Sequence, residues 1–348
     1  MSVLRPSQGT YNASYRVVWL ARSQLWGVYH HQYTPPHNKM YITVKMFVVL
    51  LLAAALALCI EWHFIHSNSN CIQPINHTAV SRAKTAGQRY VVVTLCDQAF
   101  ASAAVELVRL LRGTGAYDGD IVVLFFGEMI PKLQWEDARV FPQSAEEIMA
   151  RKPQRPPCTG DGSDMRLKRI RASAAYYYKA AIFSAEFFAK RWDRLLYLDS
   201  RMNIHQPNIQ SLFDSIDVTG AIMGNPDSWP SATWKLSTQF APECNTSLFK
   251  SIESAYNLNY ADYFQTGVIL LDTSILREGT LREIQELYHQ YAEIISNSDQ
   301  CIFNIYWGRN MHNLYKPLPY RLDGLLLVPY DYSPLTTGAK YIITANRP

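Results

Sequence analysis

The spacing of apolar residues predicts a strand, a helix and a second strand at the start of a folded domain. Residues Tyr90–Cys96 read YVVVTLC and Asp120–Phe126 read DIVVLFF, and uninterrupted runs of this kind are typical of buried strands. Between them, Ala99–Arg112 carries its apolar residues at helical spacing. This order predicts a βαβ unit and therefore a parallel sheet.

The pattern is lost after the second strand and returns further along the chain. Residues Gly127–Asp164 have no periodicity and collect prolines and glycines, which predicts a long surface excursion. A helix is expected over Ser173–Lys190 and a strand at Arg194–Leu198. The chain from Arg89 to its end suits a single α/β domain with a wide sheet.

Two acidic residues directly follow predicted strands: Asp97 follows the first, and Asp199 follows the strand that ends at Leu198. Ligands of open α/β sheets bind at the carboxyl ends of the strands, so both acids are candidates for a binding site. An acid in this place also caps the turn that follows, and spacing alone does not separate the two roles.

An uncharged apolar stretch precedes the domain. Residues Met46–Ile60 read MFVVLLLAAALALCI, and apolar positions continue past Glu61 to Ile65, giving roughly the 20 residues that a membrane span needs. A single crossing is the natural interpretation. A cleaved signal peptide translated from Met40 is an alternative, and a buried core helix is a third.

Basic residues indicate how the span is oriented. Lys39 and Lys45 lie just before it, and no Lys or Arg follows until Arg82, which predicts a cytoplasmic N-terminus. The chain is then expected to be a single-pass type II membrane protein that faces the lumen of the Golgi or of another secretory compartment. The predicted organisation is a cytoplasmic tail at 1–45, a signal anchor at 46–65, a polar stem at 66–88 and a lumenal domain at 89–348.

Composition and motifs exclude several classes of function. With 48% hydrophobic residues the chain can form a large core, and a net charge of +4 gives no broad basic face for nucleic acid. The six cysteines lack zinc-ribbon spacing, and Cys96, inside an apolar strand, is expected to be a buried free thiol. No nucleophile elbow, H-E-x-x-H, P-loop or dinucleotide-binding motif occurs.

Five stretches of the predicted lumenal region, in order, resemble the glycogenin-like retaining glycosyltransferases of family 8, which have the GT-A fold. The resemblance implies an α/β nucleotide-diphospho-sugar transferase fold, a Rossmann-like mixed sheet flanked by helices. It also implies transfer of a hexose-type sugar from a nucleotide diphosphate, expected to be a UDP-sugar, to a glycan or glycoprotein acceptor with retention. The stretches are Val93–Phe100, Tyr177–Lys179 with Trp192–Ser200, Tyr263–Leu271, Asp299–Asn304 and Lys340–Thr344.

The first two stretches imply the residues that bind the donor. Phe100 matches an aromatic residue that lies on the uracil, with Asp97 and Gln98 near the polar edge of the base. Lys179 matches a basic residue that reaches the donor from a helix. Asp199 matches the first acid of an acid-x-acid motif, which holds a divalent metal such as Mn²⁺ on the diphosphate.

The next two stretches imply the residues beside the transferred sugar. In Tyr263–Leu271, which is similar to an F-N-S-G-V strand, Gln265 stands for the amide that contacts the sugar hydroxyls. Asp299 and Gln300 begin a D-Q-x-x-x-N segment, whose acid and amide border the sugar. The catalytic residues implied are therefore Gln265, Asp299 and Gln300.

The chain departs from the family at the metal. The second acid is replaced by Arg201, and Thr344 stands where the closing strand has a metal-binding His, so only Asp199 remains as a metal ligand. A guanidinium cannot coordinate a metal, but it can stabilise a diphosphate leaving group directly. Arg201, with Lys179 or Arg347, is therefore a candidate replacement for the ion. The alternative is a catalytically inactive, membrane-tethered sugar-nucleotide or glycan-binding protein.

Overall fold

The computed structural model describes residues 88–127, 135–149, 151–152, 177–207, 209–226, 234–296, 298–327 and 340–345, all within the unit Arg82–Pro348. The predicted tail and anchor, and the stem up to residue 87, lie outside these ranges. Among the described helices, none has the length and apolar character needed to cross a membrane. The anchor at 46–65 therefore stays a prediction.

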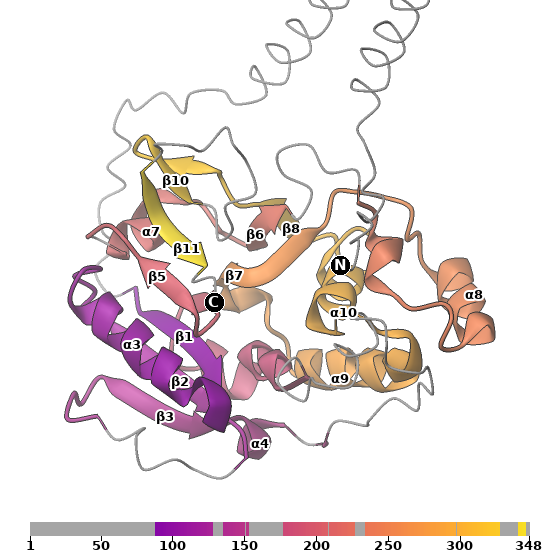
Figure 1. Cartoon of the computed structure of the whole chain (residues 1–348), viewed down its shortest axis with the longest axis horizontal. Helices are drawn as coiled ribbons and strands as arrows, with labels where there is room; N and C mark the ends of the chain where they lie inside the picture. Colours follow the sequence, from indigo (N-terminus) through magenta and orange to yellow (C-terminus); the bar gives the residue numbers. More distant parts are fainter. Residues whose placement is uncertain are drawn as a thin grey trace, which may run out of the picture. The chain divides into compact units, whose positions relative to one another are not determined.

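A seven-stranded mixed sheet lies at the centre of the described chain, in the order β3-β2-β1-β4-β7-β6-β8 (Figure 1). Strands β3, β2, β1 and β4 are parallel to one another, whereas β7 is antiparallel to both β4 and β6. The strands are β1 (Tyr90–Cys96), β2 (Asp120–Phe125), β3 (Val140–Ser144), β4 (Arg194–Leu198), β6 (Ile222–Pro226), β7 (Phe264–Asp272) and β8 (Tyr315–Pro317).

The predicted βαβ unit is confirmed. Strands β1 and β4 have the predicted bounds, and β2 ends one residue before the predicted Phe126. Helix α3 (Ala101–Arg112) follows a 3₁₀ turn, η1 (Gln98–Phe100), and packs its apolar face on β1 and β2 (Figure 1). Its buried residues lie at helical spacing, which is why the sequence pattern predicted it; they are Ala101, Ala104, Leu107, Val108 and Leu111.

The expectation that 127–164 lacks regular elements was wrong where the structure describes that segment. Strand β3 adds to the edge of the sheet parallel to β2, and α4 (Ala145–Ile148) follows it directly. The strand reads VFPQS, and only Val140 is fully buried, so it has no apolar pattern of its own. An edge strand also tolerates Pro142, because one side of its backbone needs no partner.

The single helix predicted over Ser173–Lys190 was also wrong within the described residues. The chain forms a 3₁₀ turn, η3 (Lys179–Phe183), and then one π-helical turn, η4 (Ala185–Ala189). Ser184 separates them in an extended conformation, and its hydroxyl accepts a hydrogen bond from Phe187 N. Serine side chains compete for backbone groups in this way, which apolar spacing does not reveal.

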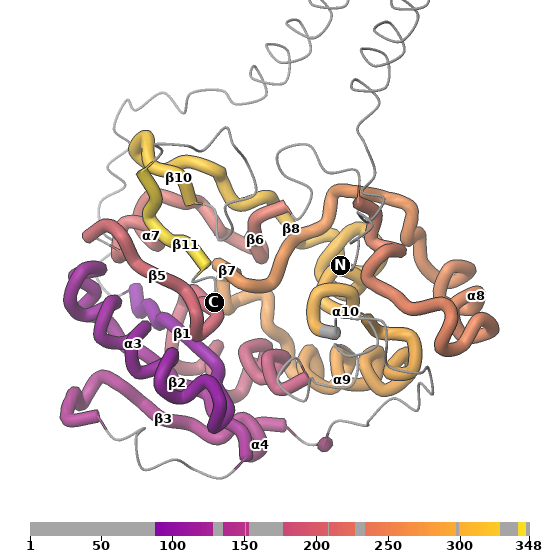
Figure 2. Tube along the Cα trace, in the orientation of Figure 1, coloured from indigo at the N-terminus to yellow at the C-terminus, as the bar shows by residue number. Residues whose placement is uncertain are grey.

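A second, four-stranded sheet lies beside the first, in the order β5-β11-β10-β9 (Figure 2). Its strands are β5 (Met202–Ile204), β9 (Arg321–Leu322), β10 (Leu325–Leu327) and β11 (Tyr341–Ala345). Strand β11 confirms the predicted closing strand, and it pairs with β5, which follows Asp199-Ser200-Arg201 directly.

Helices cover both faces of the main sheet (Figure 1). Helix α3, the small sheet and α7 (Gln210–Ser215) cover one face, while α9 (Thr280–Tyr291), α10 (Ser298–Trp307) and η3 cover the other. The predicted arrangement of a mixed sheet flanked by helices is therefore confirmed. The remaining elements are α8 (Thr246–Ala255), η5 (Leu236–Gln239), η6 (Thr273–Ile275) and η7 (Ala292–Ile294).

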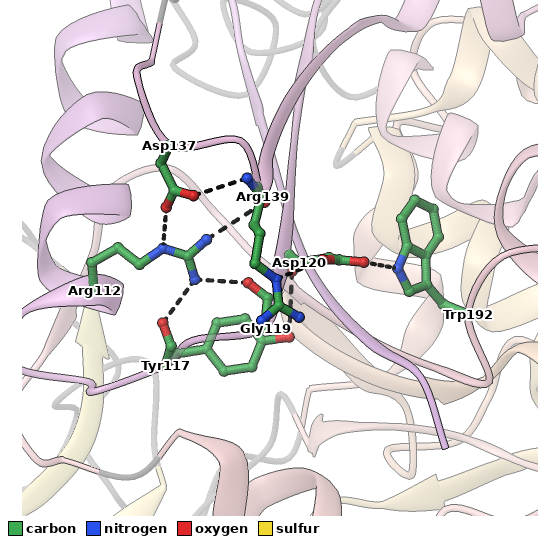
Figure 3. A network of polar contacts seen from close by, with 7 residues as sticks. All are labelled: Arg112, Tyr117, Gly119, Asp120, Asp137, Arg139 and Trp192. Carbon is green, nitrogen blue, oxygen red and sulfur yellow. Dashed lines mark hydrogen bonds and ion pairs between the residues drawn. The ribbon is translucent and has the colours of Figure 1, made fainter. Parts of the chain in front are cut away.

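A polar network fixes the amino ends of β2 and β3 (Figure 3). Arg112 Nε lies 2.6 Å from Asp137 Oδ2, and Nη1 donates to the carbonyls of Tyr117 and Gly119 at 2.7 Å each. A cavity of about 310 Å³ adjoins this network, at the opposite end of β2 from the carboxyl edge of the sheet. It is lined by Arg112, Ala116, Tyr117, Asp118, Asp137 and Arg139.

Candidate functional site

The strand order brings residues from four distant parts of the chain to one edge of the main sheet. Strands β1 and β4 are parallel neighbours, so Asp97 and Asp199, which follow them, lie at the same edge. Strand β7 is antiparallel to β4 and begins at this edge with Phe264, Gln265 and Thr266. Asp199 N donates to Gly267 O at 2.9 Å, which holds the end of β4 against the start of β7.

Lys179 lies at the centre of the site. Only 4% of the residue is exposed, and its Nζ lies 2.7 Å from Asp299 Oδ2 and 3.0 Å from Asp199 Oδ1. The same Nζ donates to Thr266 O at 3.3 Å, so each of its three protons has an oxygen to meet. One ammonium thus joins two carboxylates from separate elements.

Electrostatics keep this lysine charged. Burial by itself lowers the pKa of Lys179, but the Asp199 and Asp299 carboxylates outweigh it and raise the pKa well above its ordinary value. One positive charge faces two negative charges, which leaves the cluster with a formal charge of −1. Because Lys179 is committed to this cluster, it is not free to neutralise a ligand by itself.

Asp299 is held in place from two sides. It lies in the first turn of α10, is 4% exposed, and accepts a 2.6 Å hydrogen bond from Thr266 Oγ1 as well as the bond from Lys179. Partners of this kind offset the cost of burying a charged group so deeply. Asp299 therefore fixes α10, β7 and η3 relative to one another.

Asp199 faces outward, unlike Asp299. Its Oδ1 accepts a 2.8 Å bond from Tyr197 Oη as well as the Lys179 contact, yet about a third of its side chain is exposed (34%). Burial, with the neighbouring Asp199 carboxylate adding to it, raises the pKa of Tyr197 well above its ordinary value, so Tyr197 stays a donor. The Asp199 side chain is thus part of the site. The turn that follows is closed by the backbone carbonyl of Asp199, which accepts a hydrogen bond from Met202 N.

Asp97 caps the turn that follows it, which is the second of the two roles that its position predicted. Its Oδ1 accepts a 3.0 Å hydrogen bond from Phe100 N and caps η1. Gln98 and Phe100 are exposed, and the ring of Phe100 carries the Arg201 guanidinium at 5.3 Å from its centroid. One face of Phe100 is therefore already covered, and a base would have to use the other.

An asparagine clamps the start of β7 onto α10. Asn304 Oδ1 accepts from Phe264 N at 2.8 Å, and its Nδ2 donates to Phe264 O and to Gln300 O at 2.7 Å each. Asn304 is the last residue of the D-Q-x-x-x-N segment. Its amide thereby sets the positions of Gln265 on β7 and of Gln300 on α10.

Two buried amides at this edge have unused acceptors. Within the part of the chain that the structure describes, Gln265 Oε1 on β7 and Asn225 Oδ1 on β6 accept no hydrogen bond, although both residues are more than nine-tenths buried. Asn225 Nδ2 donates to Leu327 O at 2.7 Å, which fixes the side chain. An unpaired buried carbonyl oxygen is costly, and a ligand hydroxyl would satisfy it.

Sequence reasoning missed Asn225 and Tyr197. Asn225 lies near the end of an apolar strand that was not predicted, and the argument that selected Asp97 and Asp199 would have selected it too. Tyr197 lies on β4 two residues before Asp199, which follows the strand directly, and alternation places the two side chains on one face. The sequence contains both positions, but their place near strand ends could be recognised only once the strands had been assigned.

The closing strand brings Thr344 beside β5, where it pairs with Asn203. Thr344 Oγ1 lies 2.6 Å from His205 Nε2, so its hydroxyl already has a partner. The sheet thus places the last described strand next to the Asp199–Arg201 turn, as the resemblance implied, but with a hydroxyl in place of the imidazole.

Comparison with known proteins finds a likeness in solved structures only. No protein-family model and no curated protein sequence matches the chain. It is similar to the bifunctional glycosyltransferase WbbM in apo form, at 14% identity over 75% of this chain with a TM-score of 0.49; the match spans 46% of that longer chain.

Two further structures that it resembles are also glycosyltransferases. One is the galactosyltransferase LgtC in complex with donor and acceptor sugar analogues, at 14% identity over 73% of this chain and 86% of that one, with a TM-score of 0.47. The other is mouse xyloside xylosyltransferase 1 in apo form, at 14% identity over 74% and 97% of the two chains, with a TM-score of 0.42. Likeness at this level concerns the fold, so the function below is argued from the side chains.

Proposed function

We propose that this protein is a glycosyltransferase that moves a hexose-type sugar from a UDP-sugar to a glycan or glycoprotein acceptor, with retention. The observation that carries the proposal is the buried Lys179, which joins Asp199 and Asp299 at the carboxyl edge of the sheet. Burying the charges of Lys179 and Asp299 is expensive for a fold that needs only stability. Their place, at the edge where α/β sheets bind ligands, favours a role in binding and chemistry.

The proposed roles follow the geometry. Gln98 and Phe100 border the nucleoside at the end of β1, and Asp97 caps the turn that carries them. The exposed part of Asp199 faces the diphosphate and sugar, while Lys179 holds Asp199 in place. We assign the second half of the site, at the start of β7 and of α10, to the sugar. There Gln265, Asp299 and Gln300 would border the transferred group, and Asn225 would add a further acceptor for a sugar hydroxyl.

In the proposed reaction, the bond between the anomeric carbon and the β-phosphate oxygen breaks. Its electron pair leaves with the diphosphate as UDP. The acceptor hydroxyl oxygen forms the new bond to the anomeric carbon from the same face, and its proton passes to the departing diphosphate. Fixed charges and dipoles around the breaking bond stabilise this charge separation without reorganising, which is the main catalytic advantage of a preformed site.

A secretory compartment is part of the proposal. Cys244 is disulfide-bonded, and structural disulfides form in oxidising compartments. Cys96 and Cys301, by contrast, are buried free thiols, as was expected for Cys96. The proposed membrane anchor at 46–65 and the stem would place the domain in that lumen.

The experiment that tests the proposal is release of UDP from a panel of UDP-sugars by the purified full-length protein, with and without glycan acceptors. We expect release from one donor and a loss of at least about a hundredfold in Asp299→Asn, because the variant keeps the shape of the site but removes a charge next to the sugar. Asp262→Asn is the matched control, since Asp262 is exposed and, among the described residues, its ion pair is with Arg309 at 3.1 Å.

Each outcome separates the enzyme from the alternative. Release by the wild type that is lost in Asp299→Asn but kept in Asp262→Asn supports the transferase. Binding of UDP without cleavage of any donor would refute it and indicate a sugar-nucleotide binding protein. Equal loss in both variants would show that the effect is unspecific and that the site has been misplaced.

A further inference from the structure

The family that the sequence resembles holds a divalent ion with three protein ligands, and the residues at this site do not fit one. Among the described residues, no three His, Cys, Asp or Glu side chains lie close enough together to hold a metal. The two positions that would complete the ligand set are Arg201 and Thr344, and the Thr344 hydroxyl is occupied by His205. A hydroxyl and a guanidinium are poor substitutes for an imidazole and a carboxylate.

Asp199, the remaining candidate metal ligand, already has two partners within the protein. Asp199 Oδ1 accepts from Tyr197 Oη at 2.8 Å and from Lys179 Nζ at 3.0 Å. A hard cation at Asp199 would also face the positive charges of Lys179 nearby and of Arg201 two residues on. A divalent ion is normally held by several anionic oxygens, and here the surplus of negative charge is a single unit.

Arg201 has the properties that a diphosphate needs. It follows β4 in the turn after Asp199, and it is exposed. Its guanidinium lies 5.3 Å from the centroid of the Phe100 ring, and a stacked guanidinium keeps its N–H groups free in the plane to bind anionic oxygens. Among the described residues, no ion pair includes Arg201.

We infer that this site binds the diphosphate of its donor through the Arg201 guanidinium in place of a divalent ion. The inference rests on the proposed function and specifies how that site meets its substrate. When the glycosidic bond breaks, the electron pair moves onto the β-phosphate oxygen, and the fixed positive charge of Arg201 stabilises it. Phe100 then has a double role, since it borders the nucleoside and supports the guanidinium.

The test is calorimetric titration of UDP and of uridine into the full-length protein, in excess EDTA and in excess Mn²⁺. We expect the Kd for UDP to agree within about twofold between the two conditions. In Arg201→Ala, UDP should bind about tenfold to a hundredfold more weakly, as the loss of charge-assisted bonds to phosphate implies, while uridine is unaffected. Arg201→Lys should recover part of the UDP affinity, because it restores charge without the planar fork.

Arg191→Ala is the matched control. The Arg191 guanidinium also stacks on a phenylalanine, 4.3 Å from the ring centroid of Phe187, but it lies before β4 at the other end of that strand. Its loss should change neither titration. Because Arg201 is exposed, its truncation is not expected to unfold the protein.

Three outcomes would overturn the inference. UDP binding that disappears in EDTA and returns with Mn²⁺ would show that metal ligands exist. An Arg201→Ala variant with normal UDP affinity would show that Arg201 does not touch the diphosphate. Absence of UDP binding in both conditions would refute the donor site altogether, whereas metal-independent UDP binding without turnover would refute only the proposed function.

Discussion

Replacing Lys179 with methionine is the sharpest test of how this site is built. Methionine has a similar length and apolar character, so the change removes the ammonium without opening a large cavity. Asp299, 4% exposed, would then be left buried without its cation, and the Thr266 carbonyl would lose its donor. Breaking a buried ion pair by removing one partner costs about 3–5 kcal/mol.

The contact between Lys179 and the partly exposed Asp199 contributes less to this loss of stability. Asp199 keeps about a third of its side chain in solvent and retains the hydrogen bond from Tyr197, so water can replace Lys179 there. Most of the loss is therefore assigned to Asp299. The double variant Lys179→Met with Asp299→Asn should recover about 2–3 kcal/mol, because it removes the unpaired charge while an amide still accepts from Thr266.

The assay is urea unfolding of each purified variant, followed by tryptophan fluorescence. Lys190→Met is the control, since Lys190 is exposed and its contact with Glu186 is 3.9 Å long; a change within about 0.5 kcal/mol is expected. If Lys179→Met costs no more than this control, or if the double variant is as unstable as the single one, the buried charge does not organise the site and the reasoning is refuted.

Three further predictions concern the surroundings of the site. Asn304→Ala removes two buried hydrogen bonds between α10 and β7 and a third within α10, and it should lower the free energy of unfolding by about 2–4 kcal/mol in urea titrations. Arg112→Ala removes the contacts of Arg112 that are drawn in Figure 3, and it should lower the Tm by several degrees in thermal scans. Burial, with Asp97 adding to it, raises the pKa of Cys96 from 9.0 to about 12, so iodoacetamide at pH 8 should modify Cys96 only after unfolding.

The raised pKa of Cys96 also predicts how the stability of the protein changes with pH. Between about pH 9 and pH 12 the unfolded Cys96 loses its proton while the folded one keeps it, so stability falls as the pH rises. In Cys96→Ala this fall should be shallower, by up to about 1.4 kcal/mol per pH unit. Parallel pH profiles of the two proteins would contradict the prediction, as would rapid alkylation of the native protein.

The predictions for Arg112→Ala and Asn304→Ala can be contradicted in the same measurements. Arg109 lies on the same helix as Arg112, but its ion pair within the described chain is an exposed one with Glu106, so Arg109→Ala should leave the Tm nearly unchanged. Equal shifts in the two arginine variants would mean that the network in Figure 3 does not fix β2 and β3. For the asparagine, wild-type stability in Asn304→Ala would mean that the clamp between β7 and α10 contributes little.

The sequence by itself determined the elements whose burial is continuous along the chain. Strands β1 and β4 consist mainly of uninterrupted apolar residues, and the buried face of α3 consists of apolar residues at helical spacing. The burial of such segments follows from their local composition. The acids after β1 and β4 could be placed at one edge for the same reason, since parallel strands present their carboxyl ends together. Part of the candidate site was therefore readable in advance.

Only the tertiary structure decided what those residues contact. The sequence left Asp97 and Asp199 with the same two roles, and the fold gave them different ones, since the Asp97 carboxylate caps a turn while the Asp199 carboxylate meets Lys179 and Tyr197. Lys179 lies 20 residues from Asp199 and 120 from Asp299 along the chain. Contacts over such separations depend on the strand order, which no local pattern encodes.

The same reason explains the two wrong predictions. Strand β3 forms because β2 offers an open edge, and the helix breaks at Ser184 because its hydroxyl takes a backbone donor. Neither event is visible in apolar spacing, since one depends on a neighbouring strand and the other on a hydrogen bond. Local composition thus determined where the chain is buried, while backbone pairing and polar contacts between distant segments decided which side chains form the site.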